Sequence, residues 1–316
     1  MGAKVSVIIP VYGVEKYIER CARSLFEQTL DDIEYLFIDD CTPDKSIDVL
    51  KRVLEEYPQR KPQVTIHRME RNSGQAKVRE WGMRNATGDY LIHCDSDDWI
   101  ASDMYKKLYD KASMCGADVV VCDYFLSDGF VYKIKKGCLS EERKQMIKDM
   151  CTMRSSWALW NKLVRAGLYH DDKLIYPKDN MGEDMALTMQ LILKTEKIAY
   201  IHEPLYYYYY NPQSITNNTS EESIVKKYLN LLHNSEIVIK SFSEKGLDKM
   251  FKKELNYLKW NVRSILWEIT YKKEYRRMWV ETYRELFPSL IFSPYLKKMA
   301  KLKFLLTYIG LYPQKR

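Results

Sequence analysis

The sequence of 316 residues lacks several patterns that would place it in a specialised class of protein. No apolar run approaches the roughly 20 residues that a membrane-spanning helix needs. The seven cysteines are scattered, without a CxxC pair or zinc-like spacing, and no signal peptide precedes the first strand-like run. We therefore expect free thiols in a reducing cytoplasm rather than disulfides or a structural zinc site.

The remaining composition is that of a globular protein with unevenly placed charge. Apolar residues make up 46% and charged residues 29% of the chain, and the formal net charge is +7. The length allows one large domain or two ordinary ones. The basic excess falls in residues 221–316, which hold 20 lysines and arginines against 10 acidic residues. This balance is typical either of a surface that binds an anionic partner or of a solvated helical surface.

Strand-like and helix-like patterns alternate through the first part of the chain. Near-continuous apolar runs separated by helical spacing predict a mainly parallel sheet with helices on both faces. In such sheets ligands bind beyond the carboxyl ends of the strands. The runs are VSVIIPVY (5–12), IEYLFIDD (33–40), QVTIH (63–67), DYLIHC (89–94) and ADVVVCDY (117–124).

Two acidic clusters follow these runs directly. Asp39 and Asp40 end the second run, and the stretch IHCDSDDW places Asp95, Asp97 and Asp98 after another. Neighbouring carboxylates repel unless water, a cation or a cationic side chain compensates. Because parallel strands end at the same edge of a sheet, we expect both clusters in one crevice, where carboxylate oxygens favour Mg²⁺ or Mn²⁺. Turn and helix-cap chemistry is the alternative for either cluster alone.

The later part of the chain is more helical. MGEDMALTMQLILKT (181–195) predicts a helix that begins near Glu183 and Asp184. Acids at this position are often simple complements of the helix dipole, and that explanation stays open. Residues 221–316 predict several helices, with Trp260, Trp267 and Trp279 as packing anchors.

Four motifs in order carry a resemblance to a known family. They are VSVIIPVYGVEKYIERCARSLFEQT, IDDCTPDKS, NSGQAKVREWGMRNATGDYLIHCDSDDW and, after a gap, GED. From about Lys4 to Asn217 the sequence resembles the family 2 glycosyltransferases, the large inverting group with an α/β GT-A nucleotide-sugar-binding fold. The resemblance implies a catalytic domain over residues 1–218 and a basic helical C-terminal region over residues 219–316.

The resemblance also implies roles for individual residues. Asp184 of GED matches the general base, with Glu183 beside it, and Asp97 with Asp98 would hold Mn²⁺ or Mg²⁺. The Asp40 carboxylate would face the uracil or other base. The residues expected around the nucleotide are Pro10, Val11, Tyr12, Glu15, Asp40, Lys77, Arg79, Asp95 and Ser96.

Acceptor and membrane contacts are expected later in the chain. Trp160 and Lys162 lie in a segment that the family retains near its acceptor side, although core packing explains Trp160 equally well. The run Tyr206–Tyr210, including Tyr208, predicts either a sugar-stacking wall or an edge strand with its aromatic faces packed inward. The basic segment 293–312 predicts either contact with an anionic membrane surface or packing on the catalytic domain.

We therefore expect a metal-dependent inverting glycosyltransferase. It would move a sugar from a nucleotide-sugar donor, preferably UDP-linked, to a hydroxyl of a saccharide or polyprenyl-linked acceptor. The expected setting is cell-surface polysaccharide synthesis, in the cytoplasm or peripherally at the inner face of the membrane, without a nucleic acid partner.

Other classes fit the sequence less well. The main alternative is a non-catalytic nucleotide-sugar-binding scaffold protein, which the loss of Asp97 or Asp184 would have supported. A sugar-nucleotide pyrophosphorylase would carry a glycine-rich loop where PVYGVEKY stands, and a metal-dependent phosphatase would leave GED unexplained.

Overall fold

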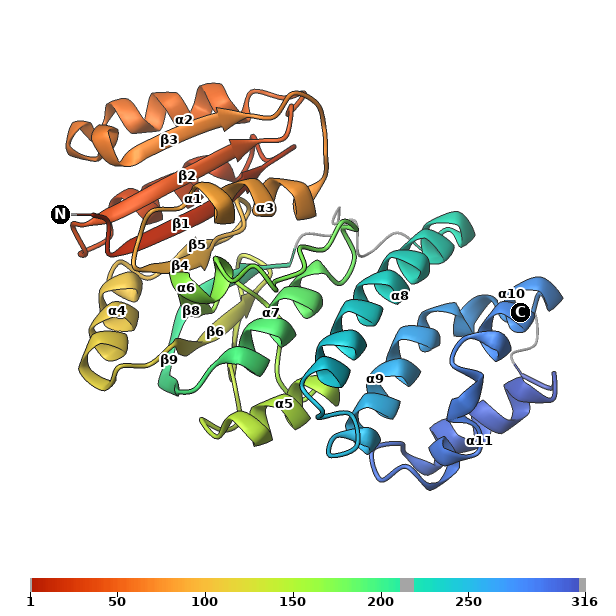
Figure 1. Ribbon diagram of the computed structural model, residues 1–316. Coiled ribbons are helices and arrows are strands. Elements are labelled where there is room, and N and C mark those ends of the chain that lie inside the picture. Colours follow the sequence, from red (N-terminus) through yellow and green to blue (C-terminus); the bar gives the residue numbers. More distant parts are fainter. Residues whose placement is uncertain (1, 211–218, 313–316) are drawn as a thin grey trace.

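The computed structural model describes residues 2–210 and 219–312, and it contains a nine-stranded sheet flanked by helices and followed by a helical region (Figure 1). The strands are β1 (Val5–Val11), β2 (Ile33–Asp39), β3 (Val64–Arg68), β4 (Tyr90–His93), β5 (Trp99–Ile100), β6 (Val119–Ser127), β7 (Tyr132–Lys135), β8 (Lys162–Arg165) and β9 (Ile198–Tyr209). The main helices beside the sheet are α1 (Ile18–Phe26), α2 (Ser46–Glu55), α3 (Gln75–Asn85), α4 (Met104–Cys115), α5 (Arg143–Cys151), α6 (Ala166–Tyr169) and α7 (Glu183–Lys194).

The sheet is mainly parallel, as the alternation of strands and helices predicts. Its strand order is β3-β2-β1-β4-β8-β6-β9-β5, with β7 paired to β6. Strands β3, β2, β1, β4, β6 and β9 run in one direction, whereas β8, β5 and β7 run against them. Because β5 pairs with Tyr206 and Tyr207, β9 lies inside the sheet, and the interpretation of the tyrosine run as an edge strand is wrong.

The alternation of side chains along β1 builds two separate cores. Val7 and Ile9 point to one face and pack with α1, α2 and α4, whereas Ile8 points to the other and packs with α3, α5 and α7. Successive residues of a strand face opposite sides of the sheet, so an uninterrupted apolar run requires cover on both. The sheet is therefore the middle layer of three, and only its ends are open to ligands.

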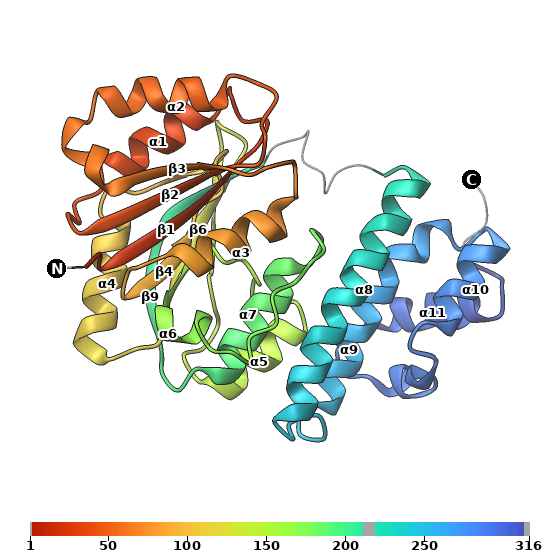
Figure 2. The ribbon, with the colours of Figure 1, turned by 45° about the horizontal axis from the view of Figure 1, so that its top comes forward.

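The helical region contains α8 (Glu221–Glu244), α9 (Lys252–Ser264), α10 (Lys273–Glu281) and α11 (Lys298–Tyr308). Helix α8 runs beside α7, and Leu231 and Val238 of α8 join the same core as Met185 of α7 (Figure 2). A third core holds α9, α10 and α11 together around Trp260 and Trp279, with Trp267 packed against it, which confirms these residues as anchors. The predicted domain boundary at residue 218 lies outside the described residues.

The carboxyl-terminal segment packs on the helical region. Phe304 of α11 is buried against Trp260 and Trp279, not against the sheet. No helix among residues 2–210 and 219–312 is both long enough and apolar enough to cross a membrane. All seven cysteines are free thiols, as the sequence predicts.

Candidate active site

Both acid clusters lie at one edge of the sheet. Strands β2 and β4 each pair with β1 in parallel, so their carboxyl ends lie side by side. Asp39 is the last residue of β2, and Asp95 lies just beyond the end of β4 at His93. Helix α3 and the first turn of α7 bring further charged side chains to the same edge, and these side chains decide what the site can do.

Arg79 of α3 is buried at the centre of this edge. Its Nη2 donates to Oδ1 of Asp95 at 2.7 Å, its Nη1 lies 3.0 Å from Nδ1 of His93, and its Nε lies 3.9 Å from Oε1 of Glu183. Burial and the Arg79 charge lower the pKa of His93 well below its ordinary value. The imidazole is therefore neutral, and its Nδ1 accepts the hydrogen bond from Arg79.

Glu183 and Asp184 begin α7 next to Arg79. The backbone N–H of Met185 donates to Oδ1 of Asp184 at 2.7 Å and orients that carboxylate. Burial and the neighbouring Asp184 charge raise the pKa of Glu183 to about 8, and burial raises the pKa of Asp184 as well. At neutral pH the pair therefore holds about one negative charge, because the two groups titrate as a coupled system.

Asp98 is fully buried, and protein donors bind both of its carboxylate oxygens. The Tyr206 hydroxyl donates to Oδ2 at 2.6 Å, and the backbone N–H of Tyr209 donates to Oδ1 at 2.7 Å. The same Tyr206 hydroxyl accepts a bond from the Asp95 backbone N–H at 3.1 Å. Burial and the charges of Asp97 and Asp95 raise the pKa of Asp98 well above its ordinary value. Asp98 therefore braces the acid loop (residues 95–98) against β9, which argues against its expected role as a metal ligand.

The acid loop fits a metal that takes few protein ligands. Among the described residues, no three His, Cys, Asp or Glu side chains converge as a preformed metal site. Asp95 and Asp97 are half-buried, whereas Asp98 is enclosed. Mg²⁺ and similar hard cations retain waters and are commonly held by one or two carboxylates together with substrate phosphates. The half-buried carboxylates of Asp97 and Asp95 fit that arrangement as its protein part.

The loops beyond β1, β2 and β3 are fastened to one another by side chains predicted to surround a nucleotide. Asp40 accepts hydrogen bonds from the backbone N–H groups of Ser73, at 2.7 Å, and Gly74, at 2.9 Å. Glu15 accepts from the Lys45 backbone N–H at 3.1 Å. Asp40 and Glu15 thus fix the shape of these three loops. The loops lie at the carboxyl ends of the strands, where the two acid clusters also lie.

The end of β1 is tied to the acid loop. The Ser96 hydroxyl donates to the Pro10 carbonyl at 2.7 Å, and the carbonyl of Val11 accepts from the backbone N–H of Asp40 at 3.1 Å. Tyr12 follows β1 and is half exposed. Pro10, Val11, Tyr12 and Ser96 are thus brought together, with the Tyr12 ring as the accessible member.

Lys77 lies apart from this group. Its ammonium pairs with Glu80 at 2.6 Å, and both residues line a hollow of about 630 Å³ on α3 together with Trp81. Residues two apart on a helix do not share a face, so Lys77 and Arg79 point in different directions. The two side chains predicted near the nucleotide on α3 therefore do not lie side by side, and the place of Lys77 at the nucleotide stays a prediction.

Lys162 is buried within charge range of Asp184, and its ammonium is bound by protein acceptors. Its side chain is buried, and Nζ donates to the carbonyls of Ser156 at 3.0 Å and Ala158 at 2.7 Å and to Oδ1 of Asn161 at 2.9 Å. Burial lowers the pKa of Lys162 to about 8. Three protein acceptors use the three donors of an ammonium group, so Lys162 fixes the loop before β8.

The tyrosine run presents two different faces. The pairing of β9 with β6 shifts register after Cys122 and again after Asp123, and beyond these shifts alternate tyrosines face opposite sides. Tyr206 and Tyr208 stack on Trp160, with ring centres 4.3 and 5.6 Å away. On the other side, Tyr207 stacks on Trp99 at 5.2 Å and on Phe125 at 4.8 Å. Trp160 is thus a packing residue, and within its stack Tyr208 is half-buried, whereas Tyr206 is enclosed and bonds the acid loop.

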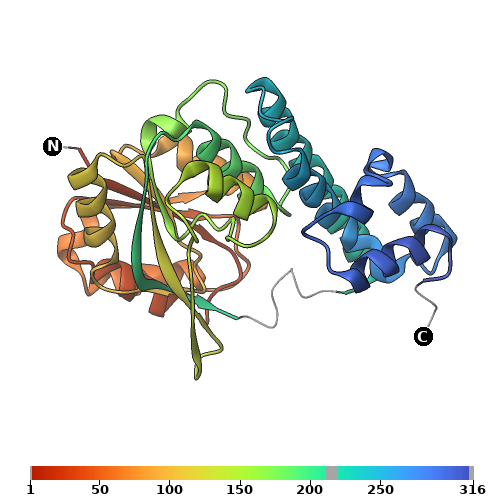
Figure 3. The same ribbon diagram turned by 90° about the horizontal axis from the view of Figure 1, so that it is seen from below.

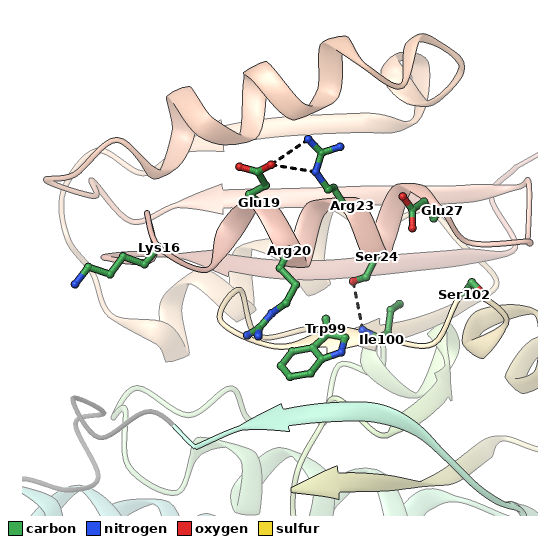
Figure 4. A pocket seen from close by; sticks show the side chains of 9 residues that line it. All are labelled: Lys16, Glu19, Arg20, Arg23, Ser24, Glu27, Trp99, Ile100 and Ser102. Carbon is green, nitrogen blue, oxygen red and sulfur yellow. Dashed lines mark hydrogen bonds and ion pairs between the residues drawn. The ribbon is translucent and has the colours of Figure 1, made fainter. Parts of the chain in front are cut away.

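Arg20 and His93 are not among the predicted site residues, and Tyr206 is predicted only as part of the tyrosine run, not as a partner of the acids. Arg20 of α1 donates from Nη2 to the Asp97 carbonyl at 2.9 Å, and its guanidinium carbon lies 3.6 Å from the centre of the Trp99 ring (Figure 4). His93 carries a sequence signal, since it lies two residues before Asp95 in an extended segment. Arg20 and Tyr206 reach the acid loop only through tertiary contacts, so no local sequence pattern predicts that they contact it.

The hollow around Arg20 is separate from the predicted donor site. It encloses about 640 Å³ between α1 and β5, with Glu19, Arg23 and Ser24 along its α1 side (Figure 4). The described residues that line it include none of the predicted site side chains. Arg20 therefore contacts the acid loop from the face of the sheet that α1 covers, whereas Arg79 contacts it from the face that α3 covers.

Comparison with known proteins identifies the family. Residues 6–163 match the sequence model of glycosyl transferase family 2, which is half of the chain. The chain belongs to this family. The glycosyltransferase EpsJ of Bacillus subtilis, itself uncharacterised, is 29% identical over 265 residues, which cover 80% of this chain and 73% of EpsJ.

Solved structures confirm the GT-A fold of this family 2 glycosyltransferase. Residues 1–349 of Staphylococcus aureus TarS, crystallised with UDP-GlcNAc, align with a TM-score of 0.61 at 18% identity over 91% of each chain. TarS, a poly(ribitol-phosphate) beta-N-acetylglucosaminyltransferase, is 27% identical over 216 residues, which cover 65% of this chain but 35% of TarS. A Pyrobaculum calidifontis mannosyltransferase in complex with GDP-Man and Mn²⁺ aligns at 0.54 and 12% identity, covering 93% of this chain and 87% of that one.

Proposed function

We propose that this family 2 glycosyltransferase is a metal-dependent, inverting enzyme that uses a UDP-sugar and a hydroxyl acceptor on a saccharide or a polyprenyl-linked saccharide. The observation that carries the proposal is a convergence around buried Arg79. The acid loop after β4 and the acid pair that begins α7 both contact this guanidinium, although about 90 residues separate them in the chain.

Asp184 is the proposed general base. The acceptor hydroxyl is a poor nucleophile and gains reactivity when a carboxylate takes its proton during attack. Burial raises the pKa of Asp184, which strengthens it as a base, while the Met185 N–H bond and the charge of Arg79 limit that rise. A single base with direct displacement gives inversion at the anomeric carbon and needs no covalent intermediate.

Glu183 plays a supporting part in this proposal. Burial and the neighbouring Asp184 charge raise its pKa to about 8, so the coupled pair holds about one negative charge at neutral pH. One charge instead of two lessens the like-charge repulsion beside the base. Its distance of 3.9 Å from Arg79 places it between the base and the acid loop.

Asp97 and Asp95 are the residues that would hold Mn²⁺ or Mg²⁺. Such an ion would stabilise the negative charge that develops on the departing diphosphate. Tyr206 and Arg20 fix the backbone of the acid loop from two sides, through the Asp95 N–H and the Asp97 carbonyl. The Mn²⁺ in the Pyrobaculum mannosyltransferase complex supports a metal in the same fold.

The proposed donor and acceptor are supported by the ligand and the substrate named for a similar protein, TarS. UDP-GlcNAc in TarS supports a UDP-sugar, with Asp40, Pro10, Val11, Tyr12, Glu15 and Ser96 around the nucleotide. The polymer substrate named for TarS supports a cell-surface polysaccharide as the setting.

In the helical region, Met299, Leu302 and Ile309 are exposed among lysines, which supports peripheral contact with an anionic membrane. In this proposal residues 219–316 form a region distinct from a cytoplasmic catalytic domain.

Calorimetric titration with UDP, GDP and dTDP tests the donor site. We expect one nucleotide, UDP, to bind in Mn²⁺ and to lose most of its affinity in EDTA. Asp97→Asn should abolish the metal dependence, while Asp103→Asn, a partly exposed acid outside the acid loop that pairs with Lys107, should bind as the wild type does. No binding of any nucleotide by the folded protein contradicts the proposal. Release of free sugar from the matching nucleotide sugar then separates an enzyme from a scaffold.

A further inference from the structure

A β-hairpin made by the end of β6 and by β7 projects from the sheet and ends in apolar side chains that face solvent. In Figure 3 it extends below the body of the molecule. All residues from 128 to 136 are exposed, and the exposed fractions of Phe130, Ile134 and Val131 are 92%, 63% and 53%. Single exposed apolar side chains are ordinary, but a contiguous group at a projecting tip indicates a contact surface.

The charge around these side chains is positive. Lys133, Lys135 and Lys136 lie in β7 or directly after it, and all three are exposed. The nearest acid in the hairpin, Asp128, is used by the turn itself. Its Oδ1 accepts from the backbone N–H groups of Phe130, at 3.0 Å, and Val131, at 2.8 Å. The tip therefore combines apolar side chains with lysines, a combination that matches the interface of an anionic bilayer.

Hydrogen bonds in the turn and ring contacts at its base fix the shape of the hairpin, and that shape leaves the apolar side chains in solvent. Gly129 occupies the turn with φ +97°, and its N–H donates to the Ser127 hydroxyl at 3.0 Å. Farther down, the Tyr132 ring packs edge-on against Trp99 at 6.4 Å and Tyr207 at 6.0 Å. Because Trp99 directly follows the acid loop, the hairpin is anchored beside the candidate active site.

We propose that the hairpin tip, residues 128–136, docks on an anionic lipid bilayer. Phe130 and Val131 enter the headgroup region, and Lys133, Lys135 and Lys136 face the lipid phosphates. This contact is additional to the carboxyl-terminal one proposed above. It requires neither a donor nor an acceptor, so it can be tested separately from the proposed function.

An edge-strand explanation accounts for only part of this pattern. Strand β7 pairs with β6 alone, and lysines on an open edge commonly prevent pairing with a second chain. That explains Lys133 and Lys135. It does not explain Phe130 and Val131, which lie in the turn beyond the paired residues and would be polar if solubility were their purpose.

The test is co-flotation of the full chain with phosphatidylcholine vesicles, with and without phosphatidylglycerol. We expect binding only with phosphatidylglycerol. Removing the Phe130 ring with Phe130→Ser should weaken it about tenfold. Lys133→Gln and Lys135→Gln should each weaken it about fivefold. Far-UV circular dichroism and thermal unfolding confirm that each variant is folded.

Two matched controls make the result specific. Met114, at the end of α4, is 87% exposed, and Met114→Ser should leave vesicle binding unchanged. Phe292 in the helical region is 80% exposed, and Phe292→Ser reports on the carboxyl-terminal contact. The proposal is overturned if the wild type does not bind vesicles or if the Phe130 and lysine variants bind as the wild type does. It is also overturned if Phe130→Ser converts a dimer to a monomer without changing vesicle binding.

Discussion

Arg79 contacts Asp95 at 2.7 Å and so connects helix α3 to the acid loop after β4. The same guanidinium faces Glu183 at the start of α7. Its side chain is 3% exposed, so the charges around it are desolvated and depend on one another. The stability of the site should therefore depend on this one arginine more than on any surface ion pair.

Replacing Arg79 with Met should lower the free energy of unfolding by about 3 kcal/mol, because two carboxylates lose their buried partner. Arg84→Met is the matched control on the same helix. Arg84 is exposed and pairs with Glu80 at the surface, so its loss should cost less than about 1 kcal/mol. Urea unfolding measures both values. Equal losses for the two variants would show that Arg79 is not the centre of the site.

Asp184→Asn should lower the rate of sugar transfer by at least about 100-fold, since proton removal by a positioned base contributes a factor of this size or more. Nucleotide affinity in Mn²⁺ should stay within about twofold, because Asp184 takes no part in holding the metal in our proposal. Asp179→Asn, in the loop before α7, is the control and should keep its activity. Steady-state kinetics and calorimetry give the two readouts. Transfer that survives the Asp184 change removes it as the base.

Tyr206→Phe should destabilise the protein by about 1–3 kcal/mol, because it leaves a buried oxygen of Asp98 without its hydrogen-bond donor. It should also weaken metal-dependent nucleotide binding, since the Tyr206 hydroxyl holds the Asp95 N–H. Tyr207→Phe, on the other face of β9, keeps its ring stacked on Trp99 and should change neither quantity. Thermal unfolding and calorimetry compare the two variants, and identical behaviour would contradict the bracing role of Tyr206.

Glu183 should make stability depend on pH. Its pKa is raised from 4.5 to about 8 by burial, so between these values the folded state binds more protons than the unfolded state. Its contribution is therefore present at low pH and is lost as the pH rises toward 8. Glu183→Gln removes this dependence, so the variant should gain melting temperature relative to the wild type between pH 5 and pH 8. A constant difference across that range would show that Glu183 is ionised in the folded protein.

The sequence predicts the sheet better than it predicts the contacts within the site. Long apolar runs such as those that become β1, β2 and β4 can be recognised as strands from the sequence, because a strand buried on both faces has no polar residues in alternation. Strand β8 does not, because KLVR is four residues long and becomes a strand only by pairing with β4 and β6. Strand β5, which has two residues, cannot be predicted from the sequence for the same reason.

The same limit applies to side chains. The position of Asp95 and Asp97 after a strand predicts their shared edge, since chain direction alone decides it. The direction of Lys162 cannot be predicted in this way, because its three acceptors come from a loop whose path depends on the rest of the fold. Asp98 likewise differs from Asp97 only through Tyr206 and Tyr209, which lie more than 100 residues away in the chain.

The register shifts in β9 restrict how this strand can change in evolution. They set which tyrosines stack on Trp160 and which on Trp99. Adding or deleting one residue between Ile198 and Leu205 would turn the whole run over and remove the Tyr206 hydroxyl from Asp98. Exchanging one aromatic ring for another would keep the arrangement except at Tyr206, whose hydroxyl is needed as well. Homologous chains that share this site should therefore vary in the identity of the other rings but conserve Tyr206 and the length of the segment that precedes it.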